Sequence, residues 1–193
     1  MQHAGGNYQT HLFMLMGPSC VGKSTILRYI KERIGADSAP KYTTRPSRGT
    51  EEDAQDFIFC DRENFPGAGI LRFESYGEWF GIQLDQIANS FKNGRSHITI
   101  VGDCSVASGL SSIYNVALVA IFVFCDSCVL KSRVFSDPSP HRAERWPQIR
   151  EEMARMYDQL GCVEFVINNS GSMENTFLQV NRLLAMLERG RVR

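Results

Sequence analysis

Residues 17–25, with the sequence GPSCVGKST, combine the residue types that bind a polyphosphate. Two glycines, a lysine and a serine stand in the spacing G-x-x-x-x-G-K-S, directly after an apolar run at residues 11–16. The glycines allow successive backbone N–H groups to point inward as an anion site, and the N-terminus of a following helix adds its positive end. The lysine can reach the outer phosphates of a nucleoside triphosphate, and the serine hydroxyl is placed to bind Mg²⁺. The residues expected to bind the nucleotide are Gly17, Ser19, Cys20, Val21, Gly22, Lys23, Ser24 and Thr25, with Ser24 also a ligand of the metal.

A second group of side chains suited to an anion lies in residues 41–48. Arg45 and Arg48 stand three residues apart around Pro46, Lys41 adds a third cation, and the segment contains no acidic residue. Two guanidinium groups so spaced form a fork for the oxygens of a phosphate, and the proline stiffens the loop that carries them. The alternative interpretation is a solvated basic loop.

A carboxylate is expected beside these groups. Asp103 stands at the end of a predicted strand at residues 97–101, and ligands gather at the C-terminal ends of parallel strands. Its side chain is a candidate to order Mg²⁺ through water or to act as a base toward a hydroxyl. A turn-forming aspartate after Gly102 is the alternative interpretation.

The elements that must position these residues follow from hydrophobic periodicity. Short apolar strands alternate with helices along the chain, which is typical of an α/β fold with a parallel sheet. We expect strands at 11–16, 57–60, 97–101, 116–124 and 162–167, a hairpin at 70–82, and helices at 23–34, 85–92 and 173–188. The segments 41–95 and 131–147 differ in texture from the rest and are expected to be insertions into one core, since 193 residues make a single domain.

Composition excludes several classes of protein. Lys+Arg and Asp+Glu are equal at 21 each, so the chain has no overall basic field for nucleic acid. The longest apolar stretch, at 116–124, is too short to span a bilayer, and the first residues do not have the pattern of a signal peptide. We therefore expect a soluble, cytoplasmic protein with a small-molecule partner, no nucleic-acid partner and no membrane association.

The six cysteines are scattered, and we expect reduced thiols rather than a disulfide framework. Cys125 and Cys128 form a single C-x-x-C pair. A zinc site would need a second pair, so buried thiols are favoured, with a redox dithiol as the alternative.

Taken in order along the chain, these motifs resemble the guanylate kinase family of P-loop nucleoside monophosphate kinases. The loop GPSCVGKST matches the phosphate loop of the family, and Thr43-Thr44-Arg45-Pro46-Ser47-Arg48 matches its T-T-R-x-x-R clamp for a monophosphate. Further matches are Asp56-Phe57-Ile58-Phe59, Phe73-Glu74, Phe80-Gly81, Leu130-Lys131-Ser132-Arg133, Arg145 with Glu152, and Val166-Ile167-Asn168-Asn169. The resemblance extends from residue 12 to about residue 188.

The resemblance implies a P-loop NTPase-type parallel sheet flanked by helices, in one kinase domain spanning residues 1–193. It implies a core of residues 11–40, 96–130 and 148–193, an acceptor-binding insertion at 41–95 and a short lid at 131–147. It further implies ATP with Mg²⁺ as cofactors and phosphoryl transfer to a nucleoside monophosphate such as GMP. A phosphate monoester is largely dianionic at neutral pH, so the reaction needs positioning and charge neutralisation rather than a general base.

The same resemblance implies roles for individual residues. Lys23, Arg45, Arg133 and Arg145 are implied as catalytic; Asn168 is implied to lie near the adenine; Lys41, Arg45, Arg48, Phe57, Glu74, Phe80 and Asp103 are implied at the acceptor; and Ser24 and Asp103 are implied at the metal. The oligomeric state is expected to be a monomer or a homodimer.

The chain departs from the family pattern at the acceptor site. Lys41, Phe57, Phe80 and Ile82 replace hydroxyl-bearing residues of the family, and the gap between Glu74 and Phe80 is short. Each lost hydroxyl removes about 1 kcal/mol of binding, for which Lys41 can compensate, and Ile82 is expected to place an apolar wall at the base. Three alternatives therefore stay open. They are a sugar-phosphate kinase of the ribose 1,5-bisphosphokinase type, a catalytically silent guanylate kinase-like binding module, and a sensor that hydrolyses ATP slowly.

Overall fold

The computed structural model of the chain describes residues 10–47, 49, 51–75, 77–102, 104–114, 117–136, 146–155, 158 and 160–190, the side chains of 51–53 excepted. Its strands are β1 His11–Met16, β2 Lys41–Thr43, β3 Phe57–Phe59, β4 Ile70–Ser75, β5 Glu78–Gln83, β6 His97–Ile100, β7 Ala117–Phe124 and β8 Phe165–Asn168. Its helices are α1 Lys23–Ile34, α2 Glu51–Asp56, α3 Leu84–Lys92, α4 Cys104–Ile113, α5 Ser127–Ser136, α6 Trp146–Ala154 and α8 Met173–Glu188, with 3₁₀ turns η1 Arg62–Asn64 and η3 Leu160–Cys162.

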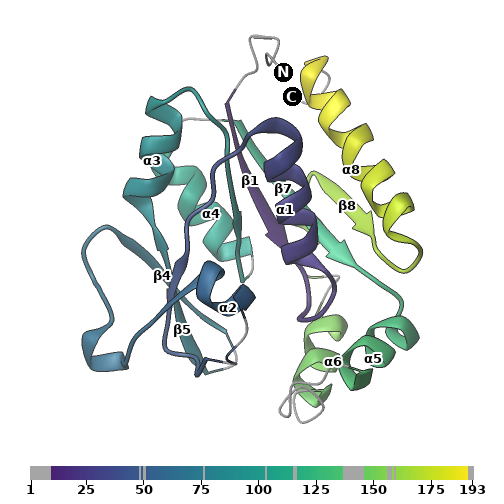
Figure 1. Ribbon diagram of the computed structural model, residues 1–193, viewed down its shortest axis with the longest axis horizontal. Helices are drawn as coiled ribbons and strands as arrows, with labels where there is room; N and C mark the ends of the chain where they lie inside the picture. The colour runs from purple at the N-terminus through teal and green to yellow at the C-terminus, as the bar shows by residue number, and fades with distance from the viewer. Residues whose placement is uncertain are drawn as a thin grey trace.

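A parallel sheet in the order β6-β1-β7-β8 lies at the centre of the molecule (Figure 1). Its strand β1 is buried on both faces: Phe13 and Leu15 pack into one apolar cluster, and Leu12, Met14 and Met16 pack into another. Helices α1 and α8 contribute to the first cluster, and α3 and α4 contribute to the second. A strand between two helical layers is apolar at successive positions, which explains the unbroken run in the sequence. The predicted α/β fold class is confirmed.

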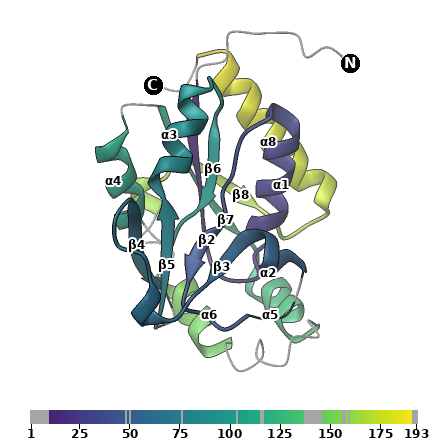
Figure 2. The same ribbon diagram turned by 60° about the vertical axis from the view of Figure 1, so that its left-hand side comes forward.

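A second sheet, in the order β3-β2-β5-β4, lies within the segment predicted as an insertion (Figure 2). Strands β4 and β5 form the predicted hairpin, with Phe73 opposite Phe80. Because side chains alternate along a strand, these two rings lie on one face and Trp79 lies on the other. On that outer face the guanidinium groups of Arg62 and Arg72 lie 5.0 and 4.4 Å from the Trp79 ring centre. The sheet thus has a face toward the core and a separate outer face.

Four of the described helices, α2, α4, α5 and α6, were not expected from the sequence. Helix α4 has the small-residue sequence CSVASGLSSI, and α5 buries only Leu130 and Val134, so neither shows a broad apolar face. Helix α5 also crosses the boundary predicted between core and lid at residue 130, and α6 begins inside the segment predicted as lid. The last strand, expected from residue 162, begins at Phe165 after the turn η3. In these segments packing on the core, rather than a local pattern, decides the structure.

One disulfide corrects the expectation of reduced thiols. Cys104, the first residue of α4, is bonded to Cys162, the last residue of η3, with Cα atoms 6.0 Å apart. The two cysteines are 58 residues apart in the chain, and only the folding of α4 and η3 on the same side of the sheet brings them together. The C-x-x-C pair Cys125 and Cys128 is not bridged.

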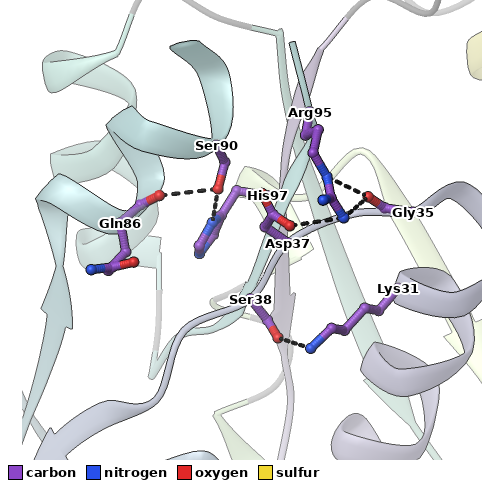
Figure 3. A network of polar contacts seen from close by, with 8 residues as sticks. All are labelled: Lys31, Gly35, Asp37, Ser38, Gln86, Ser90, Arg95 and His97. Carbon is purple, nitrogen blue, oxygen red and sulfur yellow. Dashed lines mark hydrogen bonds and ion pairs between the residues drawn. The ribbon is translucent and has the colours of Figure 1, made fainter. Parts of the chain in front are cut away.

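A polar network connects the second sheet's helix α3 to the core (Figure 3). The Ser90 hydroxyl on α3 donates to the Gln86 carbonyl and lies 2.9 Å from Nδ1 of His97, the first residue of β6. Because that hydroxyl has already donated its hydrogen, Nδ1 of His97 is the donor in this contact. Beside it, Arg95 pairs with Asp37 at 2.9 Å. Burial lowers the pKa of His97 to about 4, partly opposed by the Asp37 carboxylate.

His97 is therefore expected to make the fold sensitive to mild acid. Its pKa is about 4 in the folded chain and 6.5 in an unfolded chain, so the unfolded state binds more protons between these values. The stabilising effect is complete above pH 6.5 and is lost as the pH falls toward 4. We expect roughly 2 kcal/mol less stability from this group at pH 5 than at pH 7.5. Urea unfolding at both pH values should show a smaller difference for His97→Asn than for the parent chain; an equal difference would contradict the assignment.

Candidate phosphate-transfer site

The loop between β1 and α1 has the backbone of an anion site. Gly17 and Gly22 have φ values of 132° and 100°, and Cys20 has a φ of 65°. A Cβ atom on Gly17 would clash with the Val123 carbonyl oxygen, and one on Gly22 would clash with the Asn169 side chain. Both positions therefore require glycine for backbone conformation and for space. Helix α1 begins at the lysine of the motif, as predicted.

Lys23 is held at the loop by its own backbone. Its Nζ donates to the carbonyl oxygens of Gly17 and Pro18 at 2.6 and 2.7 Å. The ammonium group thus lies against the backbone of the loop, in the part of the cavity that the loop lines. Ser24 lines the same cavity, so its hydroxyl fits the role of a magnesium ligand alongside nucleotide phosphates, which is the usual way that proteins bind Mg²⁺.

A buried asparagine that the sequence analysis missed anchors this loop. Asn169, 2% exposed, follows β8 and donates from Nδ2 to the Val21 carbonyl at 2.9 Å. Its Oδ1 accepts from Thr176 of α8, and its carbonyl accepts from the guanidinium of Arg133 at 2.8 Å. Asn169 therefore connects the loop, α5 and α8. The sequence drew attention to the neighbouring Asn168, the last residue of β8, for a contact with adenine, and the exposed side chain of Asn168 accepts from Ser170.

One cavity of about 630 Å³ extends from the loop to the second sheet. The predicted site residues that line it are Gly17, Ser19, Cys20, Gly22, Lys23, Ser24, Thr25, Lys41, Arg45, Phe57 and Phe80. The predicted residues Val21, Glu74, Arg133 and Asn168 are described but do not line it. Arg48, Asp103 and Arg145 lie outside the residues that the structure describes. The cavity therefore joins the predicted nucleotide residues to part of the predicted acceptor residues.

Cations gather at the acceptor end of the cavity. Lys41 is buried on β2, and its Nζ donates to the Ile100 carbonyl at 3.1 Å and lies 5.3 Å from the Phe57 ring centre. The Arg45 guanidinium lies 4.9 Å from the same ring centre. Burial lowers the pKa of Lys41 to about 8; Asp56 opposes this shift, while Lys23 and Arg45 add to it. Lys41 is thus still mainly charged at pH 7, and it lies close enough to Lys23 and Arg45 for their positive charges to lower its pKa.

The wall of the cavity beside these cations is aromatic. The rings of Phe73 and Phe80 are stacked with centroids 5.5 Å apart, and Phe57 meets Phe80 at 6.1 Å edge to face. Ser75 lies on the same face of β4 and also lines the cavity. These rings make this wall of the cavity apolar, and aromatic rings are groups on which a planar molecule can stack.

Two residues expected at this wall lie elsewhere. Glu74 is exposed and pairs with Trp79 on the outer face, because it is one residue out of phase with Phe73 and Ser75. Ile82 is 2% exposed in the apolar cluster with Leu12 and does not line the cavity. The interpretation of Ile82 as an apolar wall of a base pocket is therefore corrected, and its side chain belongs to the core.

An acidic residue also reaches the loop. The Oε2 of Glu152, on α6, accepts a hydrogen bond from the backbone N–H of Ser19 at 3.2 Å, and Glu152 lines the cavity. In the sequence this residue was only part of a motif match, and its contact with the loop could not be foreseen.

The described helices include none that is long and apolar enough to cross a membrane.

The loop, the parallel sheet behind it and the second sheet across the cavity define a P-loop protein built for phosphoryl groups. The solved crystal structure of guanylate kinase from Anaplasma phagocytophilum has the same fold, with a TM-score of 0.66 at 20% identity over 93% of this chain and 87% of that one. The chain belongs to the guanylate kinase family, whose model, described as Guanylate kinase, matches residues 9–187. This confirms the predicted resemblance to the guanylate kinase family of P-loop proteins.

Curated relatives show the same similarity at modest identity. Guanylate kinase 2, chloroplastic/mitochondrial, of Oryza sativa is 27% identical over 188 residues, which are 91% of this chain and 64% of the rice protein. The guanylate kinase of Chlorobaculum tepidum is 26% identical over 167 residues, covering 83% of this chain and 85% of the relative. The chain thus spans less than two thirds of the length of the rice relative.

Proposed function

We propose that the chain transfers the γ-phosphate of ATP to a nucleoside monophosphate, with GMP as the preferred acceptor. The observation that carries this proposal is the single cavity with Lys23 and Ser24 at one end and Lys41 and Arg45 at the other. Two anionic groups bound at these ends face each other across the cavity, as in-line transfer requires. The names of the relatives supply guanylate as the first acceptor to test.

The chemistry follows from charge. The acceptor phosphate is itself the nucleophile and needs no general base, so the residues of the site act by holding and neutralising two phosphates. Lys23 binds the outer phosphates of ATP, and Arg45 with Lys41 binds the acceptor phosphate. When bound, Mg²⁺ neutralises charge on the nucleotide phosphates, with Ser24 as its protein ligand. Further parts of this proposal are a contact of Arg48 with the acceptor phosphate and closure of Arg133 and Arg145 over the transferring group. A metal-ordering role for Asp103 and an adenine contact from Asn168 also belong to it.

The base of the acceptor is proposed to stack on Phe80 and its neighbours. In the described part of this wall the polar side chain available is Ser75, since Glu74 lies on the outer face. That scarcity of polar groups favours a second candidate, a sugar phosphate bound by the same cations. Selectivity between bases comes from paired polar contacts, so the base that this chain prefers has to be determined by experiment.

An ADP-release assay with Mg²⁺ and ATP tests the proposal. The acceptors are GMP, dGMP, AMP, CMP, UMP, dTMP and ribose 1,5-bisphosphate, with a control that lacks acceptor. We expect turnover that depends on GMP and exceeds that on the other nucleotides. Turnover on ribose 1,5-bisphosphate alone would favour the second candidate. ATP binding without turnover on any acceptor would contradict both and indicate a binding module.

A further inference from the structure

A carboxylate of the chain itself, that of Glu152, contacts the phosphate loop. Glu152 accepts from the Ser19 N–H at 3.2 Å, although 133 residues separate the two in the chain. The N–H groups of such a loop are the donors that bind phosphate oxygens, and a carboxylate, like a phosphate, offers anionic oxygens that accept from them. The contact therefore uses a donor of the nucleotide site.

Core packing, rather than chance, aims this carboxylate at the loop. Helix α6 is seated by Ile149, which is 1% exposed in the apolar cluster beneath the loop. Glu152 is three residues further along, so the two side chains share one face of the helix. The neighbouring Glu151 is exposed. Figure 1 shows α6 beside the loop that joins β1 to α1.

Helix α5, which packs against α6, is connected to the same loop. Phe135 of α5 meets Trp146 of α6 with ring centroids 6.2 Å apart. From α5, Arg133 donates to the carbonyl of Asn169, whose side chain holds Val21 of the loop. Helix α6 thus contacts the loop directly through Glu152, and α5 is connected to the loop through Asn169.

We propose that Glu152 competes with the phosphates of ATP for the loop, so that ATP binding must displace this carboxylate and shift α6. The inference rests on the proposed function in one respect, that the loop binds ATP. The Glu152 carboxylate and an ATP phosphate at the same N–H donors would repel each other, and this repulsion is strongest in a site partly shielded from water. The cost of displacing Glu152 lowers the affinity for ATP and links nucleotide binding to the position of α6.

The test is calorimetric titration of the full chain with ATP, in EDTA and separately in excess Mg²⁺. Glu152→Gln keeps the shape and removes the charge, and Glu151→Gln is the matched control on the same helix. We expect Glu152→Gln to lower the Kd for ATP about tenfold in both conditions, the equivalent of 1.4 kcal/mol, because a charged hydrogen bond has been replaced by a neutral one. Glu151→Gln should leave the Kd within twofold of the parent.

Other outcomes overturn the inference. An unchanged or raised Kd for Glu152→Gln shows that the carboxylate does not compete. Weaker binding in Mg²⁺ alone shows that Glu152 supports the metal instead. A parallel titration with tripolyphosphate separates this inference from the proposed function. If neither ATP nor tripolyphosphate binds to any variant, both fall; if both bind with the same Kd in all variants, the inference alone falls.

Discussion

Replacing Lys23 with methionine is expected to lower kcat for ADP formation by roughly a thousandfold or more. Methionine keeps an unbranched stem but has no charge to place on the transferring phosphoryl group. The melting temperature should change little, since the Gly17 carbonyl to which Lys23 donates borders the cavity, where water can replace the ammonium group. The measurement is turnover at saturating ATP and acceptor, with a thermal melt of the same preparation.

The matched control is Lys92→Met, which removes an exposed lysine from the last turn of α3, away from the cavity. Its kcat should equal that of the parent chain. A Lys23→Met variant that turns over at the parental rate would show that the loop does not act on the phosphates of ATP. A variant that fails to fold would be recognised in the melt, and Lys23→Arg, which keeps the charge on a different geometry, would then replace it in the assay.

The phosphate loop and its supports were predictable because their determinants are local. Gly17 and Gly22 adopt positive φ, and this backbone conformation is a property of a short segment. The clashes that a Cβ would make at these positions are with the distant residues Val123 and Asn169 and could not be read from the loop itself. Helix α1 has the expected bounds because its apolar face, its loop and its terminating Gly35 are all adjacent in the chain. The run at β1 likewise indicates burial on both faces whatever lies beside it. For these parts the sequence carries the physics directly.

The acceptor wall was less predictable because it depends on which face of a strand meets the cavity. In β4 a shift of one residue would exchange the faces on which Glu74 and Ser75 lie. Because both faces of this sheet carry aromatic groups, the sequence pattern alone does not show which face lines the cavity. Ile82 lies on the same face of β5 as Phe80, but two residues further along the strand, where that face packs against the core instead of lining the cavity.

Contacts across many residues were not predictable at all. Asn169 on Val21, Glu152 on Ser19 and the disulfide of Cys104 with Cys162 each join segments that only the finished fold brings together. In each case the sequence shows a polar or sulfur side chain near the end of an element, but not its partner. A local sequence pattern therefore does not predict such contacts, although the contacts of Asn169 and Glu152 are the ones that hold the loop.

Replacing Arg45 with alanine is expected to lower kcat/KM for the acceptor by about a hundredfold to a thousandfold while leaving the Kd for ATP unchanged. Arg45 is placed by its own surroundings: its backbone N–H donates to the Thr43 hydroxyl at 3.1 Å, and its guanidinium lies over the Phe57 ring. Truncating a charged partner of a bound phosphate leaves that phosphate partly uncompensated, which costs about 2–5 kcal/mol. Initial rates over a range of acceptor concentrations, with ATP binding measured separately, give both quantities.

The control for this prediction is Arg72→Ala, on the outer face of the same sheet. Its guanidinium also lies over an aromatic ring, 4.4 Å from the centre of Trp79, but it does not line the cavity. If loss of a ring-stacked arginine merely loosened the sheet, both variants would lose activity together. If Arg45→Ala instead weakened ATP binding, the clamp would act on the donor nucleotide and the two ends of the cavity would have to be exchanged. Loss confined to the acceptor kinetics of Arg45→Ala, with Arg72→Ala at the parental rate, is the result that a phosphate clamp in the cavity requires.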